Sequence, residues 1–158
     1  MDNDILNKLF EKEFGELLIG INGFHFYKKD EIGEGQIGYR CNADYVKLDD
    51  WIGDNYFVIG YEVLLGDPIL VNVEDDKLPI YSLVRDDYSI CYKIANSLED
   101  YRKILKMIMD SDLTVREVVD NLILDIKKIN RGLDIDYWKD FLMGVHEDVS
   151  TIYSKKND

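Results

Sequence analysis

Long apolar runs are missing from this sequence. No stretch reaches the roughly 18 consecutive apolar residues that a membrane-spanning helix needs. The first residues, MDNDILNKLF, carry acidic rather than basic side chains, which does not fit the start of a signal peptide. We therefore expect a cytoplasmic protein with no membrane partner.

Cysteine and histidine are also scarce, with two residues of each. Cys41 and Cys91 could form one disulfide, but without an export signal two unpaired thiols are the favoured interpretation. His25 and His146 lie far apart in the sequence, and neither has a second metal-binding residue type at ligand spacing. No zinc pattern, P-loop, G-x-S-x-G or H-E-x-x-H motif occurs. Because no set of groups converges as a catalytic site requires, we expect no metal, no cofactor and no enzyme activity.

Basic residues are also few compared with acidic residues. Lys and Arg number 19 against 32 Asp and Glu, which gives a net charge of −13. Residues 1–100 hold 21 acidic and 9 basic side chains, whereas residues 101–158 hold 11 and 10. Such a field repels nucleic acid and attracts basic proteins, so a basic protein is the expected partner. A general role in solubility is the alternative explanation of the acidity.

Apolar material is sufficient for a core. Apolar residues make up 46% of the 158 residues and aromatic residues 12%, and no repeat or Pro-rich linker divides the chain. A chain of this length forms one ordinary domain that buries about 70% of its unfolded surface. We predict an α+β fold over residues 1–158, with a mostly antiparallel central sheet of about five or six strands flanked by helices.

The stretch Val58 to Tyr81 organises the prediction. Ile69 and Val71 alternate with Leu70 and Asn72, which is typical of a strand with one strongly buried face. Turns precede and follow this strand at Gly66-Asp67-Pro68 and at Glu74 to Lys77, and Pro79 opens the next strand. The pattern predicts a meander of three strands.

Other segments predict the remaining elements in the first two thirds of the chain. Apolar spacing indicates a helix over residues 3–19, capped by Asp2 or Asn3 and stopped by Gly20 and Gly23. Strands are predicted at residues 24–27, 45–48, 79–84 and 89–94, the last two joined by a hairpin at residues 85–88.

Capping patterns predict the helices of the last third. Ser97-x-x-Asp100 begins one helix, and Thr114-x-x-Glu117 has the full capping-box spacing and begins a second, which Gly132 ends. Asp134 or Asp136 can cap the last helix. We expect these two C-terminal helices to pack together and onto the sheet.

A literal G-x-G-x-x-G occurs at residues 33–38. A dinucleotide site needs an apolar strand before this motif and a helix after it, whereas KKDEI precedes it and YRCNAD follows. We therefore interpret the segment as a hairpin tip or loop, not as a cofactor site.

The central stretch also resembles the core of the SUKH (SMI1/KNR4-like) superfamily. The matching motifs are Ile59-Gly60, Gly66-Asp67-Pro68-Ile69 and Leu78-Pro79-Ile80-Tyr81, followed by Ile94 to Tyr101 at the start of the next helix. Phe14 to Leu18 with Asn22-Gly23 resembles the first helix of the family and its end. The resemblance covers about residues 1–110, so that residues 111–155 would form a C-terminal helical extension. A tryptophan common in the family is absent, and Tyr88 and Tyr92 occupy its region. The positions given structural roles are Gly60, Gly66, Asp67, Pro68, Pro79 and Ser97.

The resemblance implies a partner. Many bacterial SUKH proteins are immunity proteins that bind and neutralise toxin domains, often nucleases with basic substrate-binding surfaces. The implied function is stoichiometric binding of a basic toxin by a monomer or weak homodimer. Two alternatives stay open: a regulatory scaffold that binds an endogenous protein or peptide, and an enzyme acting on a small ligand in a cleft of the sheet.

Clustered carboxylates beside aromatic residues are the candidate contacts. Interfaces favour Trp and Tyr as anchors, and carboxylates attract Lys and Arg. The candidate partner-binding residues are Asp49, Asp50, Trp51, Asp54, Tyr56, Glu74, Asp75, Asp76, Asp86 and Asp87, with Trp51 and Tyr56 as anchors. The alternative is that Trp51 packs into the core while the aspartates cap turns. Calcium at Asp49, Asp50 and Asp54 is disfavoured, because their spacing lacks the register of a calcium loop.

Overall fold

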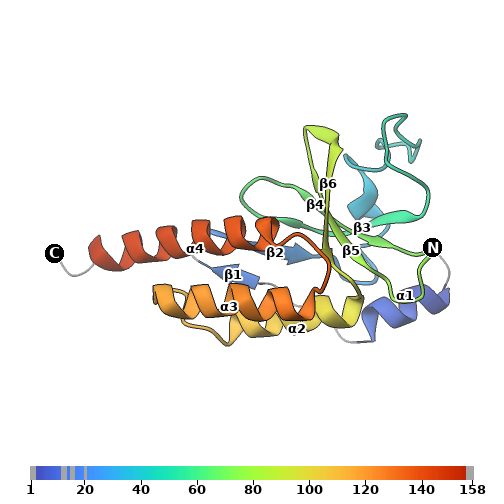
Figure 1. Ribbon diagram of the computed structural model, residues 1–158. Helices are drawn as coiled ribbons and strands as arrows, with labels where there is room; N and C mark the ends of the chain where they lie inside the picture. Colours follow the sequence, from blue (N-terminus) through green and yellow to red (C-terminus); the bar gives the residue numbers. More distant parts are fainter. Residues whose placement is uncertain (1–2, 12–13, 15–16, 20, 156–158) are drawn as a thin grey trace.

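The computed structural model describes residues 3–11, 14, 17–19 and 21–155. Within these residues, six antiparallel strands form one sheet in sequence order: β1 (Leu17–Ile19), β2 (Asn22–Phe26), β3 (Tyr56–Glu62), β4 (Pro68–Asn72), β5 (Ile80–Val84) and β6 (Asp87–Ala95). The helices are α1 (Asn3–Phe10), α2 (Leu98–Met109), α3 (Arg116–Ile129) and α4 (Asp136–Lys155) (Figure 1). The predicted α+β fold, with two further C-terminal helices, is confirmed.

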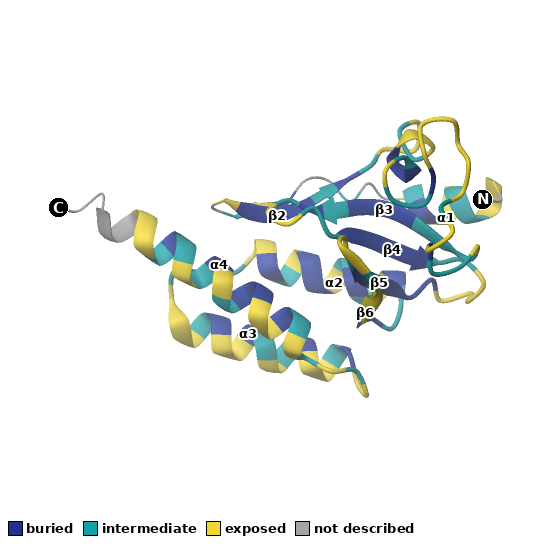
Figure 2. Ribbon diagram, turned by 90° about the horizontal axis from the view of Figure 1, so that it is seen from above, coloured by how far each residue is buried: buried dark blue, intermediate teal, exposed yellow. Residues whose placement is uncertain are grey.

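One face of the sheet is covered by helices. Figure 2 shows α2, α3 and α4 on one side of the strands and the long segment between β2 and β3 on the other. The helices bury an apolar stripe against the sheet, as amphipathic helices do. The core on this side includes Phe24, Ile59, Ile69, Val71 and Ile80 from the strands and Tyr101, Ile104, Val119, Ile126, Trp138, Leu142 and Val145 from the helices.

The C-terminal helices are joined to the sheet by polar contacts as well. The Ile94 carbonyl at the end of β6 accepts hydrogen bonds from Trp138 Nε1 at 2.8 Å and from Asn130 Nδ2 at 2.6 Å. Since α3 and α4 share one apolar core with α2 and the strands, the C-terminal helices pack directly onto the rest of the described fold. Every helix within the described residues is too short or too polar to cross a lipid bilayer.

Strand β4 is buried on both of its faces. Ile69, Leu70 and Val71 each expose 0% of their surface, although only the face of Ile69 and Val71 was expected to be deeply buried. Leu70 belongs to a second apolar cluster on the other side of the sheet. The prediction of one buried face was wrong because a period-2 pattern does not reveal a distant segment that covers the opposite side.

The Gly-Asp-Pro turn before β4 has the structural role expected. Gly66 adopts a φ of 74°, in the left-handed region that glycine tolerates. Asp67 Oδ1 accepts a hydrogen bond from the Arg85 backbone N–H at 2.9 Å and so ties this turn to the end of β5. In β3, a side chain at Gly60 would lie 2.2 Å from the His25 carbonyl oxygen, so the close approach of β2 and β3 requires glycine there.

The prediction of a helix over residues 3–19 was wrong at its C-terminal end. Helix α1 ends at Phe10, and Leu17–Ile19 is strand β1, where Leu17 pairs with Phe24 and Ile19 with Asn22. Pairing with β2 gives the backbone N–H and C=O groups of this segment hydrogen-bond partners. This interaction outweighs the weak preference of its residues for a helix. Asp2 and Gly20, the expected cap and stop, and Gly15-Glu16 of the family-like stretch lie outside the described residues.

Two other local predictions also need correction. Residues 45–48 form no strand of the sheet, because Asn42 Oδ1 accepts hydrogen bonds from the N–H groups of Asp44 and Val46 and closes a tight turn. The hairpin between β5 and β6 is shorter than predicted, since β6 begins at Asp87 and leaves only Arg85 and Asp86 between the strands. The G-x-G-x-x-G segment lies in the β2–β3 connection, with a single 3-10 turn at Glu34–Gln36, in agreement with a loop.

The two predicted helix caps differ in outcome. Ser97 Oγ accepts a hydrogen bond from the Asp100 N–H at 3.0 Å, so the predicted cap of α2 is confirmed. Thr114 does not cap α3, since its hydroxyl donates to Asp112 Oδ1 and Val115 occupies the cap position without a side-chain bond. The turn formed by Asp112 takes the hydroxyl that a capping box would use. Asp134 Oδ1 accepts from the Asp136 N–H at the start of α4, as expected.

This difference gives a paired prediction. Ser97→Ala should lower the free energy of unfolding by about 1 kcal/mol, because a helix N–H loses its partner. Thr114→Ala should lower it by less than about 0.5 kcal/mol, because its exposed hydroxyl satisfies no helix N–H. Urea denaturation of both variants measures the two changes. Equal losses of unfolding free energy in the two variants would show that the Ser97 side chain does not stabilise α2 as its cap.

Candidate functional site

The face of the sheet opposite the helices is lined with tyrosine. Its buried centre is Trp51, Val58, Leu70 and Leu83. Around this centre lie half-buried tyrosines from the strands and from the β2–β3 connection: Tyr27, Tyr39, Tyr56, Tyr61, Tyr81 and Tyr88. We call these six residues the tyrosine face. Half-buried tyrosines combine apolar area with a polar end, which is the combination that protein interfaces favour.

Ring contacts hold the tyrosine face in a fixed arrangement. The ring centroids of His25 and Tyr61 are 5.0 Å apart, and those of Tyr27 and Tyr61 are 6.0 Å apart. Tyr56 and Tyr81 meet edge-on at 5.3 Å. Such pairs contribute about 0.5–1.5 kcal/mol each beyond area burial, so the rings are ordered before any partner arrives.

Trp51 is part of the sheet packing and not of the surface. Its side chain is only 5% exposed and meets the Tyr88 ring edge-on at a centroid distance of 5.7 Å. The interpretation of Trp51 as a core residue is therefore confirmed, and an anchor role would require it to leave the core. Tyr56, the other proposed anchor, is half-buried and stays available.

Gln36 fixes the covering segment to the sheet. Its side-chain Nε2 donates to the Ile32 and Val58 carbonyls at 2.8 Å, and its Oε1 accepts from the Val58 N–H at 3.0 Å. The amide thus continues the ladder of β3 as a backbone group would. Tyr39 adds a second attachment, since its hydroxyl donates to the Gly66 carbonyl at 3.0 Å.

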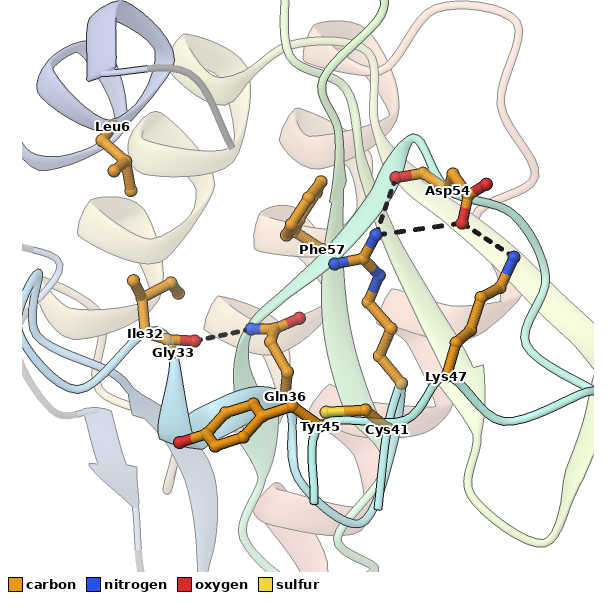
Figure 3. A pocket seen from close by; sticks show the side chains of 10 residues that line it. Leu6, Ile32, Gly33, Gln36, Cys41, Tyr45, Lys47, Asp54 and Phe57 are labelled. Atoms are coloured by element: carbon orange, nitrogen blue, oxygen red, sulfur yellow. Dashed lines mark hydrogen bonds and ion pairs between the residues drawn. The ribbon is translucent and has the colours of Figure 1, made fainter. Parts of the chain in front are cut away.

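A cavity of roughly 470 Å³ lies next to this attachment (Figure 3). Asp54 Oδ1 lies 2.7 Å from Lys47 Nζ, and the Arg40 guanidinium stacks on the Phe57 ring at 4.0 Å and donates to the Asp54 carbonyl at 3.2 Å. Lys47 holds the pKa of the Asp54 carboxyl below its usual value. Because Asp54 is already engaged by two cations, it adds less free negative charge to the surface than the sequence suggests.

Carboxylates from separate segments surround the tyrosine face. Burial raises the pKa of Tyr88, and the charges of Asp50 and Asp86 raise it further against the opposing charge of Arg85. Burial and Tyr56 raise the pKa of Tyr81, and Asp75 adds to the effect. The chain itself holds two of these carboxylates near Tyr88: Asp50 precedes Trp51, whose ring meets the Tyr88 ring at 5.7 Å, and Asp86 lies in the hairpin just before Tyr88.

The candidate carboxylates come from three segments, residues 49–54, 74–76 and 86–87, and these segments do not form one patch. Asp75 lies near Tyr81, at the end of the sheet where β4 leaves and β5 begins, whereas Asp86 lies in the hairpin at the other end. The backbone carbonyl of the neighbouring Asp76 accepts a hydrogen bond from Lys8 of α1. This part of the β4–β5 turn therefore lies against the helix. Asp87 accepts from the N–H and hydroxyl of Ser89, and the hydroxyl bond in particular lowers the pKa of its carboxyl. Asp50 lies toward the same end of the sheet as Asp86, so carboxylates from two of the three segments lie around Tyr88.

Sequence reasoning found the carboxylates but missed most of the tyrosines. The signal was present, because Tyr56 and Tyr81 occupy strand positions that alternate with Phe57 and Ile80, which pack into the core on the helix-facing side. Within the part of the chain that the structure describes, no three His, Cys, Asp or Glu side chains are grouped so as to hold a metal ion. Cys41 and Cys91 are unpaired.

No family model, curated protein or solved structure matches this chain. The similarity to the SUKH superfamily therefore rests on the motif residues alone.

The elevated pKa of Tyr27 gives a pH prediction. Burial first, then the neighbouring Tyr39 and Tyr61, raise the pKa of Tyr27 from 10.0 to about 12. The stabilisation from neutral Tyr27 is complete below about pH 10, where the unfolded chain is also neutral, and is lost as the pH rises to about 12. Urea denaturation between these values should show a smaller loss of stability in Tyr27→Phe than in the unmodified protein. Parallel losses in the two proteins would contradict the placement of Tyr27.

Proposed function

We propose that this protein binds and neutralises a basic protein partner through the tyrosine face and the carboxylates around it. The observation that supports it best is a sheet face with six half-buried tyrosines, some of them in mutual contact, on which Trp51, next to Asp50, packs against Tyr88 and beside which Asp86 lies in the β5–β6 hairpin. Tyrosine rings receive arginine and lysine side chains by stacking and cation–π contact, and carboxylates pair with the same cations. The net charge of −13 accelerates encounter with a basic surface.

The partner class follows from the family resemblance. If the SUKH-like motifs indicate common descent, the partner is a bacterial toxin domain, with a nuclease favoured because its substrate-binding surface is basic. The acidic tyrosine face would then cover that surface in place of nucleic acid. The protein acts by stoichiometric binding, in the cytoplasm where such a toxin would act, and no chemical step is required of it.

Calorimetry against a panel of basic toxin domains, both nuclease and non-nuclease, tests this function. We expect a tight one-to-one complex with one nuclease, with affinity that falls as salt rises, because surface charges are screened. Weak binding to several partners with little dependence on salt would favour a regulatory scaffold instead. Absence of binding to every basic domain would overturn the proposal.

Charge removal should act mainly on the rate of association. Asp50→Asn with Asp86→Asn should slow association with the toxin domain about tenfold at low salt, because electrostatic steering depends on charges near the interface. The matched control is Glu117→Gln with Glu147→Gln, which removes two charges from exposed positions on α3 and α4. Stopped-flow kinetics measures both rates. Equal slowing by the two variants would show that net charge alone steers binding.

Ring removal should act mainly on dissociation. Tyr56→Ala and Tyr81→Ala should each raise the dissociation rate by about 10- to 100-fold, which is the effect of truncating an interface anchor. Tyr92→Ala is the control, since Tyr92 is exposed on β6 but pairs with Ser82 on the helix-facing side. Surface plasmon resonance measures the dissociation rates, and thermal unfolding verifies that each variant is folded. A Tyr92 effect larger than those of Tyr56 and Tyr81 would place the interface elsewhere.

A further inference from the structure

A second cavity, with a volume of roughly 820 Å³, lies between α4 and the helix-facing side of the sheet. Strand residues such as Glu62 of β3 and Ser82 of β5 form one wall, and Tyr137 and Phe141 of α4 form the other. The volume is in the range of small-molecule sites in proteins. The sheet separates this cavity from the tyrosine face.

The polar groups of this cavity are predominantly negative. Glu62 is only 6% exposed, although a buried carboxylate is costly without a positive partner. Its Oε2 accepts one hydrogen bond, from the Leu65 N–H at 2.8 Å. The other charged groups of the lining are Asp67, Asp134, Asp136, Asp140 and Lys93. Five carboxylates therefore face one ammonium group.

An independent feature of the cavity is the hydroxyl of Tyr137. The hydroxyl oxygen is closed off from solvent, although the residue as a whole is half-buried, and Ser82, Glu62 and Asp67 line the same cavity. Ser82 is a polar neighbour, yet the hydroxyl makes no hydrogen bond of normal geometry with any described residue. A buried hydroxyl without a partner is unfavourable, and its oxygen can accept a hydrogen bond from a ligand with an N–H donor.

The remaining walls are apolar. Leu64 and Leu65 are 53% and 67% exposed at the mouth of the cavity, and Leu133 and Phe141 line its interior. A ligand with a hydrocarbon stem would cover leucine side chains that are otherwise in water. The lining of the cavity thus combines carboxylates with apolar side chains.

We propose that this cavity binds an aliphatic cation, with its ammonium group beside Glu62 and the Tyr137 hydroxyl and its stem along Leu64, Leu65 and Phe141. The partial positive charge at the start of α4 opposes a cation, but it amounts to only about half an elementary charge, against an excess of four carboxylates in the lining. Two sources share this chemistry: a free aliphatic amine and the lysine side chain of a peptide. The proposal does not depend on the function of the tyrosine face.

Three probes of similar length and different charge test the proposal on the full chain. Pentylamine, pentanol and pentanoate are titrated while the backbone amide signals of Glu62, Leu65 and Tyr137 are followed by NMR. Pentylamine should shift these signals with a dissociation constant below about 1 mM, a reasonable value for a ligand of this size. Pentanol and pentanoate should bind at least tenfold more weakly. Absence of a pentylamine shift, or equal binding of the three probes, would overturn the proposal.

A capped lysine peptide, titrated in the same way, separates the two sources. Tighter binding of pentylamine than of the peptide assigns the cavity to a free amine, and the reverse order assigns it to a lysine side chain. Either order supports the cation site, because the amine and the lysine peptide both require the carboxylates of the lining.

Variants distinguish a built site from general attraction to an acidic protein. Glu62→Gln retains an acceptor for the Leu65 N–H and removes the charge, so it should weaken pentylamine binding at least tenfold. Glu117→Gln removes the same charge from exposed α3 and should change binding less than about twofold. Equal weakening by both variants would overturn the proposal.

Gly144→Leu provides a second test if Glu62→Gln does not fold. Gly144 lines the cavity, and a Cβ atom there meets no other atom within 4 Å, so a leucine can occupy the cavity without a backbone clash. This variant should abolish pentylamine binding while α4 stays folded, as helical circular dichroism would show. Unchanged binding to a folded Gly144→Leu protein would also contradict the site.

Discussion

Strand β4 is buried on both of its faces, and the packing on each side of the sheet follows from this burial. Ile69, Leu70 and Val71 are completely buried, so the sheet requires a cover on each side. Three helices supply one cover, with Trp138 and Asn130 bonded to the end of β6. The other side of the sheet is covered differently, since the long β2–β3 connection contains one 3-10 turn and no α-helix. The cover is formed instead by Trp51, Tyr27 and Tyr39 of this connection and by tyrosines of the strands.

A sheet face closed by tyrosines differs physically from one closed by leucines. Each ring buries apolar area at its base and leaves a hydroxyl at its edge, so the surface that remains is ordered but still able to form hydrogen bonds. Gln36 is central to this arrangement, because its three hydrogen bonds hold the connection against β3. The same connection brings Asp50 beside the β5–β6 hairpin, so acidic and aromatic groups from distant parts of the chain meet around Tyr88.

The sequence predicted those parts of the structure that local interactions determine. The β3–β5 meander, the cap at Ser97 and the amphipathic C-terminal helices follow from residues close together in the chain, and all were predicted correctly. Leu17–Ile19 was misassigned as helix because its backbone groups pair with strand β2. Thr114 was misassigned as a helix cap because its hydroxyl bonds to Asp112 instead. The tyrosine face was missed for a different reason: its tyrosines read as the polar half of each strand, and only the β2–β3 connection shows that side to be covered. Of the candidate site, the carboxylates were predictable from composition, but the burial of Trp51 and the pairing of Asp54 with Lys47 depend on tertiary structure.

Hydrogen–deuterium exchange of the complex with its toxin domain shows whether the tyrosine face captures a basic protein. We expect slower exchange at residues 49–56 and in β5 and β6 around Tyr81 and Tyr88, with α3 and α4 unchanged. Slower exchange confined to α3 and α4, with no change on the strands, would contradict it.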